Sequence, residues 1–155
     1  MHLPDLEACL QQAAQQSCVL AVLRHPEHEG MWTIALDGAT ALHAEWDAPK
    51  GWLRLWAELG PLADRQRLGS VQSLIARYAA AVERSRIGLG PGNTYELYSH
   101  WRVDLRCPEH LAALFDELAP VVATWREILA RPPGVRPPPA SVDHGLTDMR
   151  QRFMV

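Results

Sequence analysis

The residues best suited to chemistry in this sequence are histidines and carboxylates a few positions apart. His25-Pro26-Glu27-His28 places two imidazoles near one carboxylate. The two-histidine motif of zinc proteases needs a wider spacing on one face of a helix, whereas Pro26 and the nearby Gly30 favour a loop. We therefore expect neither a metal nor another cofactor at this segment.

A second set of residues would suit acid-base chemistry. His43 and Glu45, together with Arg54, lie in strand-like segments and could share one face of a sheet. The glycines of Gly88-Leu89-Gly90-Pro91-Gly92 imitate a phosphate loop, but a strand pattern follows them, so no helix N-terminus is available to meet a phosphate. The favoured interpretation is a protein that is not an enzyme. A small enzyme using the sheet face remains an alternative.

Length and charge narrow the class of protein. A chain of 155 residues suits one domain. Its formal net charge of -3 does not fit the broad basic surface of a nucleic-acid binder, so no nucleic-acid partner is expected. No apolar run approaches the roughly 20 residues of a membrane span, and the N-terminus lacks the pattern of a signal peptide. We expect a cytoplasmic protein with no membrane partner.

Hydrophobic periodicity predicts the elements that position these residues. Helical spacing predicts helices over about 5–16, 65–85 and 108–129, and Pro120 is expected to kink or split the last one. Strand patterns cover 18–23, 31–37, 41–46, 52–59, 87–89 and 94–105. The first of these segments is expected to be a buried strand. Asp37-Gly38 is typical of a two-residue hairpin turn. This order predicts an α+β fold in which a twisted antiparallel sheet is flanked by three helices.

The strand predicted at 52–59 has one unusual face. Leucines and alanine alternate on one side, whereas Trp52, Arg54, Trp56 and Glu58 alternate on the other. Either another element covers the two tryptophans, or they form a partner surface, since aromatic patches rimmed by charge are typical of interfaces.

The composition changes after residue 130. Residues 1–130 are expected to form the domain and residues 131–155 a proline-rich, extended tail, because five prolines between positions 132 and 139 do not support a packed element. Leu146, Met149 and Phe153 follow a loosely helical spacing and would suit a short docking helix.

The order of elements over residues 5–130 resembles the class I type III secretion chaperones, the family that includes the chaperone of the Tir effector. The local stretches that carry this resemblance are Leu55-Trp56-Ala57-Glu58-Leu59-Gly60-Pro61-Leu62, Leu89-Gly90 leading into Tyr95-Glu96-Leu97, and Phe115 followed by Ala123-Thr124-Trp125-Arg126-Glu127-Ile128-Leu129. The sequence departs from the family in its less acidic character, in Pro120 and in the tail beyond Arg131.

The resemblance implies a homodimer in the bacterial cytoplasm that serves virulence. Its partner would be the N-terminal segment of a type III secreted effector, which it would keep partly unfolded for export without a cofactor. Candidate partner contacts are Leu6, Leu10, Leu20, Val22, Trp52, Arg54 and Trp56. The resemblance places the dimer contact at Leu74, Tyr78, Val82, Tyr95, Leu97 and Trp101. A non-catalytic interaction or adaptor domain that regulates another protein is the main alternative.

Overall fold

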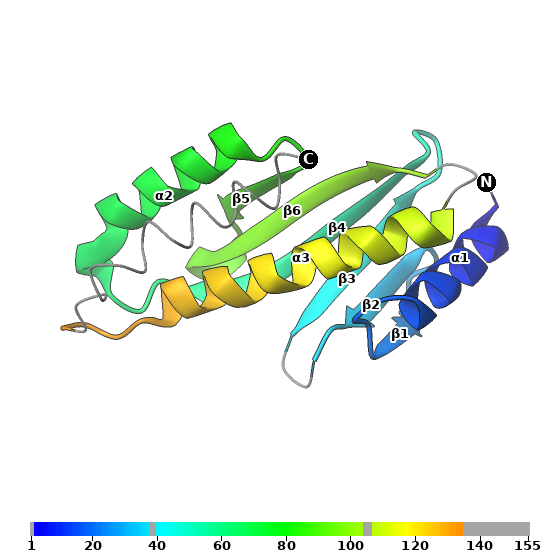
Figure 1. Ribbon diagram of the computed structural model, residues 1–155, viewed down its shortest axis with the longest axis horizontal. Helices are drawn as coiled ribbons and strands as arrows, with labels where there is room; N and C mark the ends of the chain where they lie inside the picture. Colours follow the sequence, from blue (N-terminus) through cyan, green and yellow to red (C-terminus); the bar gives the residue numbers. More distant parts are fainter. Residues whose placement is uncertain (1, 38–39, 104–106, 135–155) are drawn as a thin grey trace.

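The chain folds as a sheet with helices on one side (Figure 1). The computed structural model describes residues 2–37, 40–103 and 107–134. The helices are α1 (Leu3–Gln15), α2 (Leu68–Ala81) and α3 (Cys107–Ala130), with short 3-10 turns at Arg65–Arg67 and Pro91–Asn93. The strands are β1 (Ala21–Arg24), β2 (Met31–Ala35), β3 (Ala41–Asp47), β4 (Trp52–Pro61), β5 (Ser85–Leu89) and β6 (Thr94–Arg102).

The six strands form one sheet in the order β1-β2-β3-β4-β6-β5, and every neighbouring pair is antiparallel. The first four strands form a meander. After α2 the chain returns as β5 at the far edge, and β6 then pairs with β4. Strands β1 and β5 are therefore the two edges of the sheet.

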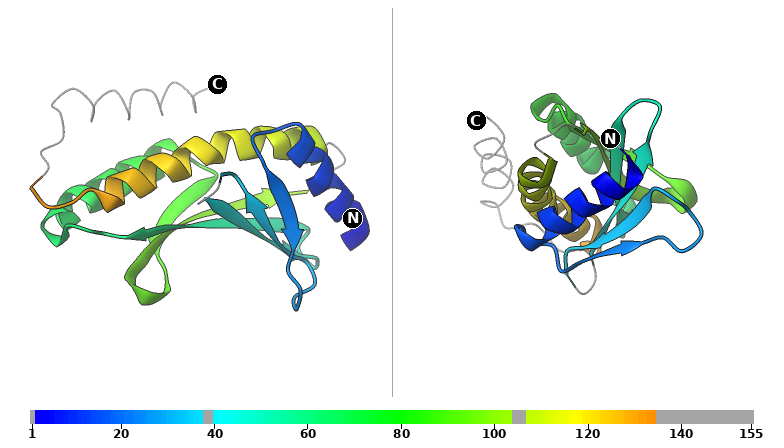
Figure 2. Two further views of the ribbon diagram at one scale, coloured as in Figure 1. Left: turned by 90° about the horizontal axis from the view of Figure 1, so that it is seen from below. Right: turned by 90° about the vertical axis from the view of Figure 1, so that its right-hand side faces the viewer.

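All three helices lie on the same side of the sheet (Figure 2). Helices α1 and α3 cover its inner face, and α2 lies beside α3 near β5, where Tyr78 packs edge-on against Trp125 with ring centroids 5.8 Å apart. The core lies between these layers. Its fully buried members include Leu6, Leu10, Leu53, Leu55, Leu97, Leu111, Phe115 and Trp125. The other face of the sheet carries no helix among the described residues.

The predicted α+β fold, with its helix-strands-helix-strands-helix order, is confirmed. The first helix begins at Leu3 because the main-chain N–H of His2 donates to Asp5 at 3.3 Å, an N-terminal cap that precedes the apolar stripe. Helix α3 runs through Pro120 without being split. Pro120 is exposed, so water can solvate the carbonyl left without its helical donor.

One predicted strand differs in its environment. The segment at 18–23 was expected to be buried, but β1 is an edge strand that begins at Ala21, and Leu20 and Leu23 are 69% and 59% exposed. An apolar run can therefore form an edge strand of a sheet as well as a central one. Three predicted features lie outside the described residues: the Gly38 half of the hairpin turn, the end of the strand expected to reach Leu105, and the tail from residue 135 onward.

Candidate functional site

The uncovered face of the sheet presents a row of side chains that crosses all six strands. The strand register places Leu23, Thr33, His43, Trp56, Tyr98 and Arg86 opposite one another in turn. Thr33 Oγ1 lies 3.4 Å from His43 Nδ1, and the His43 ring stacks on Trp56 at a centroid distance of 5.3 Å. Cross-strand contacts of this kind stabilise a sheet and fix the direction of its side chains.

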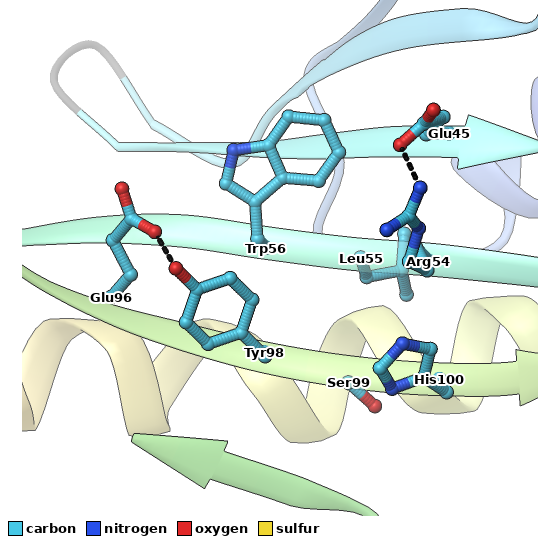
Figure 3. Close-up of a pocket in the computed structure, with 8 residues that line it drawn as sticks. All are labelled: Glu45, Arg54, Leu55, Trp56, Glu96, Tyr98, Ser99 and His100. Carbon is cyan, nitrogen blue, oxygen red and sulfur yellow. Dashed lines mark hydrogen bonds and ion pairs between the residues drawn. The ribbon is translucent and has the colours of Figure 1, made fainter. Parts of the chain in front are cut away.

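A second row of charged side chains lies beside the first. Glu45, Arg54 and His100 are opposite one another on β3, β4 and β6. Arg54 Nη2 donates to Glu45 Oε2 at 2.8 Å, and both side chains are well exposed. Such an exposed pair contributes little to stability, but it holds the guanidinium over the sheet (Figure 3).

Two shallow, open hollows adjoin the second row, one between the two rows and one on its other side, toward Trp52. The first has a volume of about 210 Å³ and is lined by Glu45, Arg54, Leu55, Trp56, Glu96, Tyr98, Ser99 and His100 (Figure 3). The second, of about 320 Å³, is lined by Asp47, Lys50, Trp52, Arg54 and His100. The Tyr98 hydroxyl donates to the Glu96 carboxylate, and this hydrogen bond raises the pKa of Tyr98. The hollows combine aromatic surface with polar groups, as polypeptide-binding surfaces do.

The geometry of this face does not form the acid-base pair of the enzyme alternative. His43 contacts Thr33 and Trp56, whereas the Glu45 carboxylate binds Arg54. Within the described ranges, no group of three or more His, Cys, Asp and Glu side chains could hold a metal ion. None of the helices in the described part of the chain combines the length and apolar character that a membrane crossing requires.

The edge strand β1 offers a second surface. The His25 N–H donates to the Met31 carbonyl at 2.8 Å, so the alternation of antiparallel strands turns the main-chain groups of Val22 and Arg24 away from β2. The Val22 carbonyl accepts a hydrogen bond from Gln11 Nε2 of α1 at 3.3 Å. Gln11 thus occupies part of an edge that is otherwise able to pair with a further strand.

The candidate partner contacts fall into three environments. Leu6, Leu10 and Val22 are buried in the chain's own core, so their side chains are not offered to a partner. Leu20, Trp52 and Arg54 are exposed and Trp56 is half-buried. Leu20 precedes β1, whereas Trp52, Arg54 and Trp56 lie on β4, so the structure does not bring all seven together.

The candidate dimer contacts are also mostly internal. Tyr78, Val82, Tyr95 and Leu97 are buried in this chain, and only Leu74 and Trp101 are half-exposed. The Tyr78 hydroxyl is hydrogen-bonded to the Ser85 hydroxyl, and burial raises the pKa of Tyr78. These four side chains cannot meet a second copy without rearrangement, because they already pack against β5, β6 and α3.

Sequence reasoning missed three residues of these surfaces. Leu23 lies on the uncovered face at the β1 edge, and Tyr98 and His100 line the hollows. The alternation of β6 did place Tyr98 and His100 on its polar side. No pattern in the sequence marked β1 as an edge, because that position depends on where the other strands lie.

No protein-family model matches this chain, and no curated protein matches its sequence. Solved structures with a similar fold do exist. One is the Yersinia pestis type III secretion chaperone SycH, in complex with a stable fragment of YscM2. That match has a TM-score of 0.55 and 14% identity, and covers 77% of this chain and 98% of SycH.

A second similar structure is the HopA1-SchA chaperone-effector complex, with a TM-score of 0.49 and 20% identity over 81% of this chain and 90% of the other. At 14% identity, the likeness to SycH establishes a shared fold.

Proposed function

We propose that this protein is a class I type III secretion chaperone, which binds the N-terminal segment of a secreted effector and keeps it partly unfolded for export. The observation that carries the proposal is the apolar, exposed edge strand β1 on a fold shared with SycH. An unfolded segment gains affinity by adding a strand to such an edge and by placing apolar side chains on the surface beside it.

The β1 edge supplies both components of this binding mode. Leu20 and Leu23 provide exposed apolar surface, and the outward main-chain groups of Val22 and Arg24 provide hydrogen-bonding capacity. A strand that pairs here replaces the hydrogen bond that Gln11 makes to Val22. Replacement of one hydrogen bond by another costs little net free energy, so the edge stays available.

The uncovered sheet face extends the binding surface. The row that starts at Leu23 leads through Thr33 and His43 to Trp56. Trp56 and the more exposed Trp52 are the aromatic anchors of the effector segment, and Arg54 lies between them on β4. Tryptophan and arginine are enriched among the residues that dominate binding energy at interfaces.

In this proposal the chaperone acts as a homodimer in the bacterial cytoplasm, serves virulence and needs neither catalysis nor a cofactor. Helix α2 buries only Val71 and Tyr78, leaving Leu68 44% exposed and Leu74 and Ile75 half-exposed. This apolar strip is the dimer surface, since a second copy would cover what one copy leaves open.

The test is co-expression of the protein with the N-terminal region of the protein encoded beside it. The variant Leu20→Glu/Leu23→Glu should weaken binding about tenfold or more, because it places two charges at the edge that receives the added strand. Leu89→Glu is the matched control, since Leu89 is 60% exposed on the opposite edge strand β5.

Isothermal titration calorimetry would measure the affinity, and limited proteolysis of the bound segment would report whether it is unfolded. Equal binding by both variants would exclude the β1 edge. A bound partner that is compactly folded and not exported would identify the protein as an adaptor domain instead.

A further inference from the structure

Strand β5 is shorter than the strand it pairs with, and this leaves part of β6 without a neighbour. The β5–β6 ladder ends where Ser85 pairs with Ser99, whereas β6 continues to Arg102 alongside β4. On the β5 side, the Gly90 N–H donates to the Thr94 carbonyl at 2.7 Å. On the β4 side, the Val103 N–H donates to the Gly51 carbonyl at 3.3 Å.

These two hydrogen bonds fix the direction of every main-chain group in β6. In an antiparallel strand the N–H and C=O of one residue point to the same side, and successive residues alternate. Even-numbered residues of β6 therefore face β5. The pairing of Ser85 with Ser99 is of the non-hydrogen-bonded kind, so the last main-chain contacts of the ladder lie between Arg84 and His100. Arg102 turns its main-chain groups toward the space beyond them, and within the described residues no strand pairs with it there.

A groove of about 920 Å³ occupies that space. Its lining includes Arg84, Arg86 and Arg102, against two carboxylates from Glu83 and Glu117. Arg86 Nη1 donates to the carbonyl of Ser85 at 2.8 Å and also to that of Val82, which holds its guanidinium at this end of the sheet.

Aromatic and apolar side chains form the remainder of the groove. Trp52, Trp101 and Leu114 line it, and Trp101 packs edge-on against His110 with ring centroids 6.5 Å apart. The groove shares His100 and Tyr98 with the first hollow of the uncovered face, so the two are adjacent. Arginine excess, apolar surface and an unpaired strand edge thus coincide at one place.

We propose that this groove binds a short extended peptide segment rich in Asp and Glu, which adds as a strand beside Arg102 and places its carboxylates against Arg84 and Arg102. Arginine recognises carboxylates through paired N–H donors, and main-chain pairing supplies affinity independent of sequence. The inference rests on the proposed function only in that the acidic segment belongs to the same escorted polypeptide.

A second copy of the chain fits this edge less well. A two-fold pairing of β6 with itself through Arg102 would bring the two arginine clusters face to face. Like charges brought together at an interface are unfavourable. An acidic segment instead places negative charges against the arginines, so no such repulsion arises.

The test uses a fluorescein-labelled peptide of alternating Glu and Val, and the matching peptide of alternating Lys and Val. Fluorescence anisotropy at low salt should show binding of the acidic peptide alone. Arg84→Gln/Arg102→Gln should weaken that binding about fivefold to tenfold, as the loss of two solvent-accessible ion pairs predicts. The control Arg65→Gln/Arg77→Gln removes two exposed arginines outside the groove and should leave binding unchanged.

Backbone pairing is tested with two N-methylated versions of the acidic peptide, each methylated on one of the two alternating sets of residues. Only one set of N–H groups faces β6, so one version should lose binding and the other retain it. Equal binding of both versions, equal binding of the Lys-Val peptide, or no binding of the acidic peptide would overturn the proposal.

The same measurements separate this inference from the proposed function. Leu20→Glu/Leu23→Glu should lose the effector segment while binding the acidic peptide as the unmodified chain does. If Arg84→Gln/Arg102→Gln instead alters the oligomeric state in light scattering and the peptide does not bind, a second copy occupies the groove and the inference is wrong.

Discussion

At the scale of single residues, Trp52 and Trp56 lie on the same strand and face but in different surroundings. Trp52 is 37% exposed at the start of β4, whereas Trp56 is half-buried and stacked on His43. Neither belongs to the core, unlike Trp125, which is 1% exposed. Side chains of this kind can contribute to partner binding without determining the fold.

We expect Trp52→Ala to lower the free energy of unfolding by about 0.5 kcal/mol or less, and Trp56→Ala by about 1 kcal/mol, since the latter loses a cross-strand ring contact. Each should weaken effector binding by about 2 kcal/mol. Urea unfolding and calorimetry measure the two effects. Trp125→Ala is the control for a core position and should cost about 3–5 kcal/mol. A loss of that size at Trp52 would contradict its assignment as an anchor.

At the scale of elements, α3 accommodates a proline in its interior. Pro120 lacks the N–H that would bind the carbonyl four residues earlier, and its ring crowds the preceding turn. The helix nevertheless continues to Ala130, where the Leu129 carbonyl accepts from the Ala63 N–H at 3.0 Å. Burial of Leu118, Val121 and Val122 on either side of the proline outweighs the missing hydrogen bond.

Pro120→Ala should therefore stabilise the protein, by about 1–3 kcal/mol, because it restores a helical hydrogen bond and removes the crowding. The midpoint of urea unfolding would rise without a change in slope. Ala123→Gly, at another exposed position of α3, is a control that should destabilise by up to about 1 kcal/mol. An unchanged or lower midpoint for Pro120→Ala would contradict this account and show that the proline itself contributes to the packing of α3.

The sequence predicts the environment of some of these elements correctly and that of others wrongly. Alternation in β4 identified Leu53, Leu55, Ala57 and Leu59 as the buried face, because one face of a covered sheet must be apolar. The same reasoning failed for β1, since an apolar run has the same pattern at the centre and at an edge of a sheet. The family resemblance, and not the periodicity, suggested Tyr78 as a dimer contact, and in this chain Tyr78 is buried against Trp125. Which apolar residues meet within one chain is a property of topology, and local periodicity does not contain it.

At the scale of the whole molecule, light scattering should give the mass of a dimer at tens of micromolar, an order-of-magnitude concentration at which dimers of micromolar Kd persist. Leu68→Glu should weaken the dimer about tenfold or more, because it places a charge in the exposed strip of α2. Leu23→Glu is the control, since Leu23 is also well exposed but lies at the β1 edge. A monomeric wild-type protein at this concentration would count against the chaperone assignment.

The position of α3 also has a consequence for biosynthesis. The last described helix packs against the first helix and against β4, and Asp116 of α3 accepts a hydrogen bond from the Cys18 N–H at 2.7 Å. Cys18 and Asp116 are 98 residues apart in the sequence, so a ribosome delivers the two partners well separated in time. The four-stranded meander thus emerges with its apolar face uncovered until α3 has been synthesised. We expect nascent chains of this protein to be most prone to aggregation between the synthesis of β4 and that of α3.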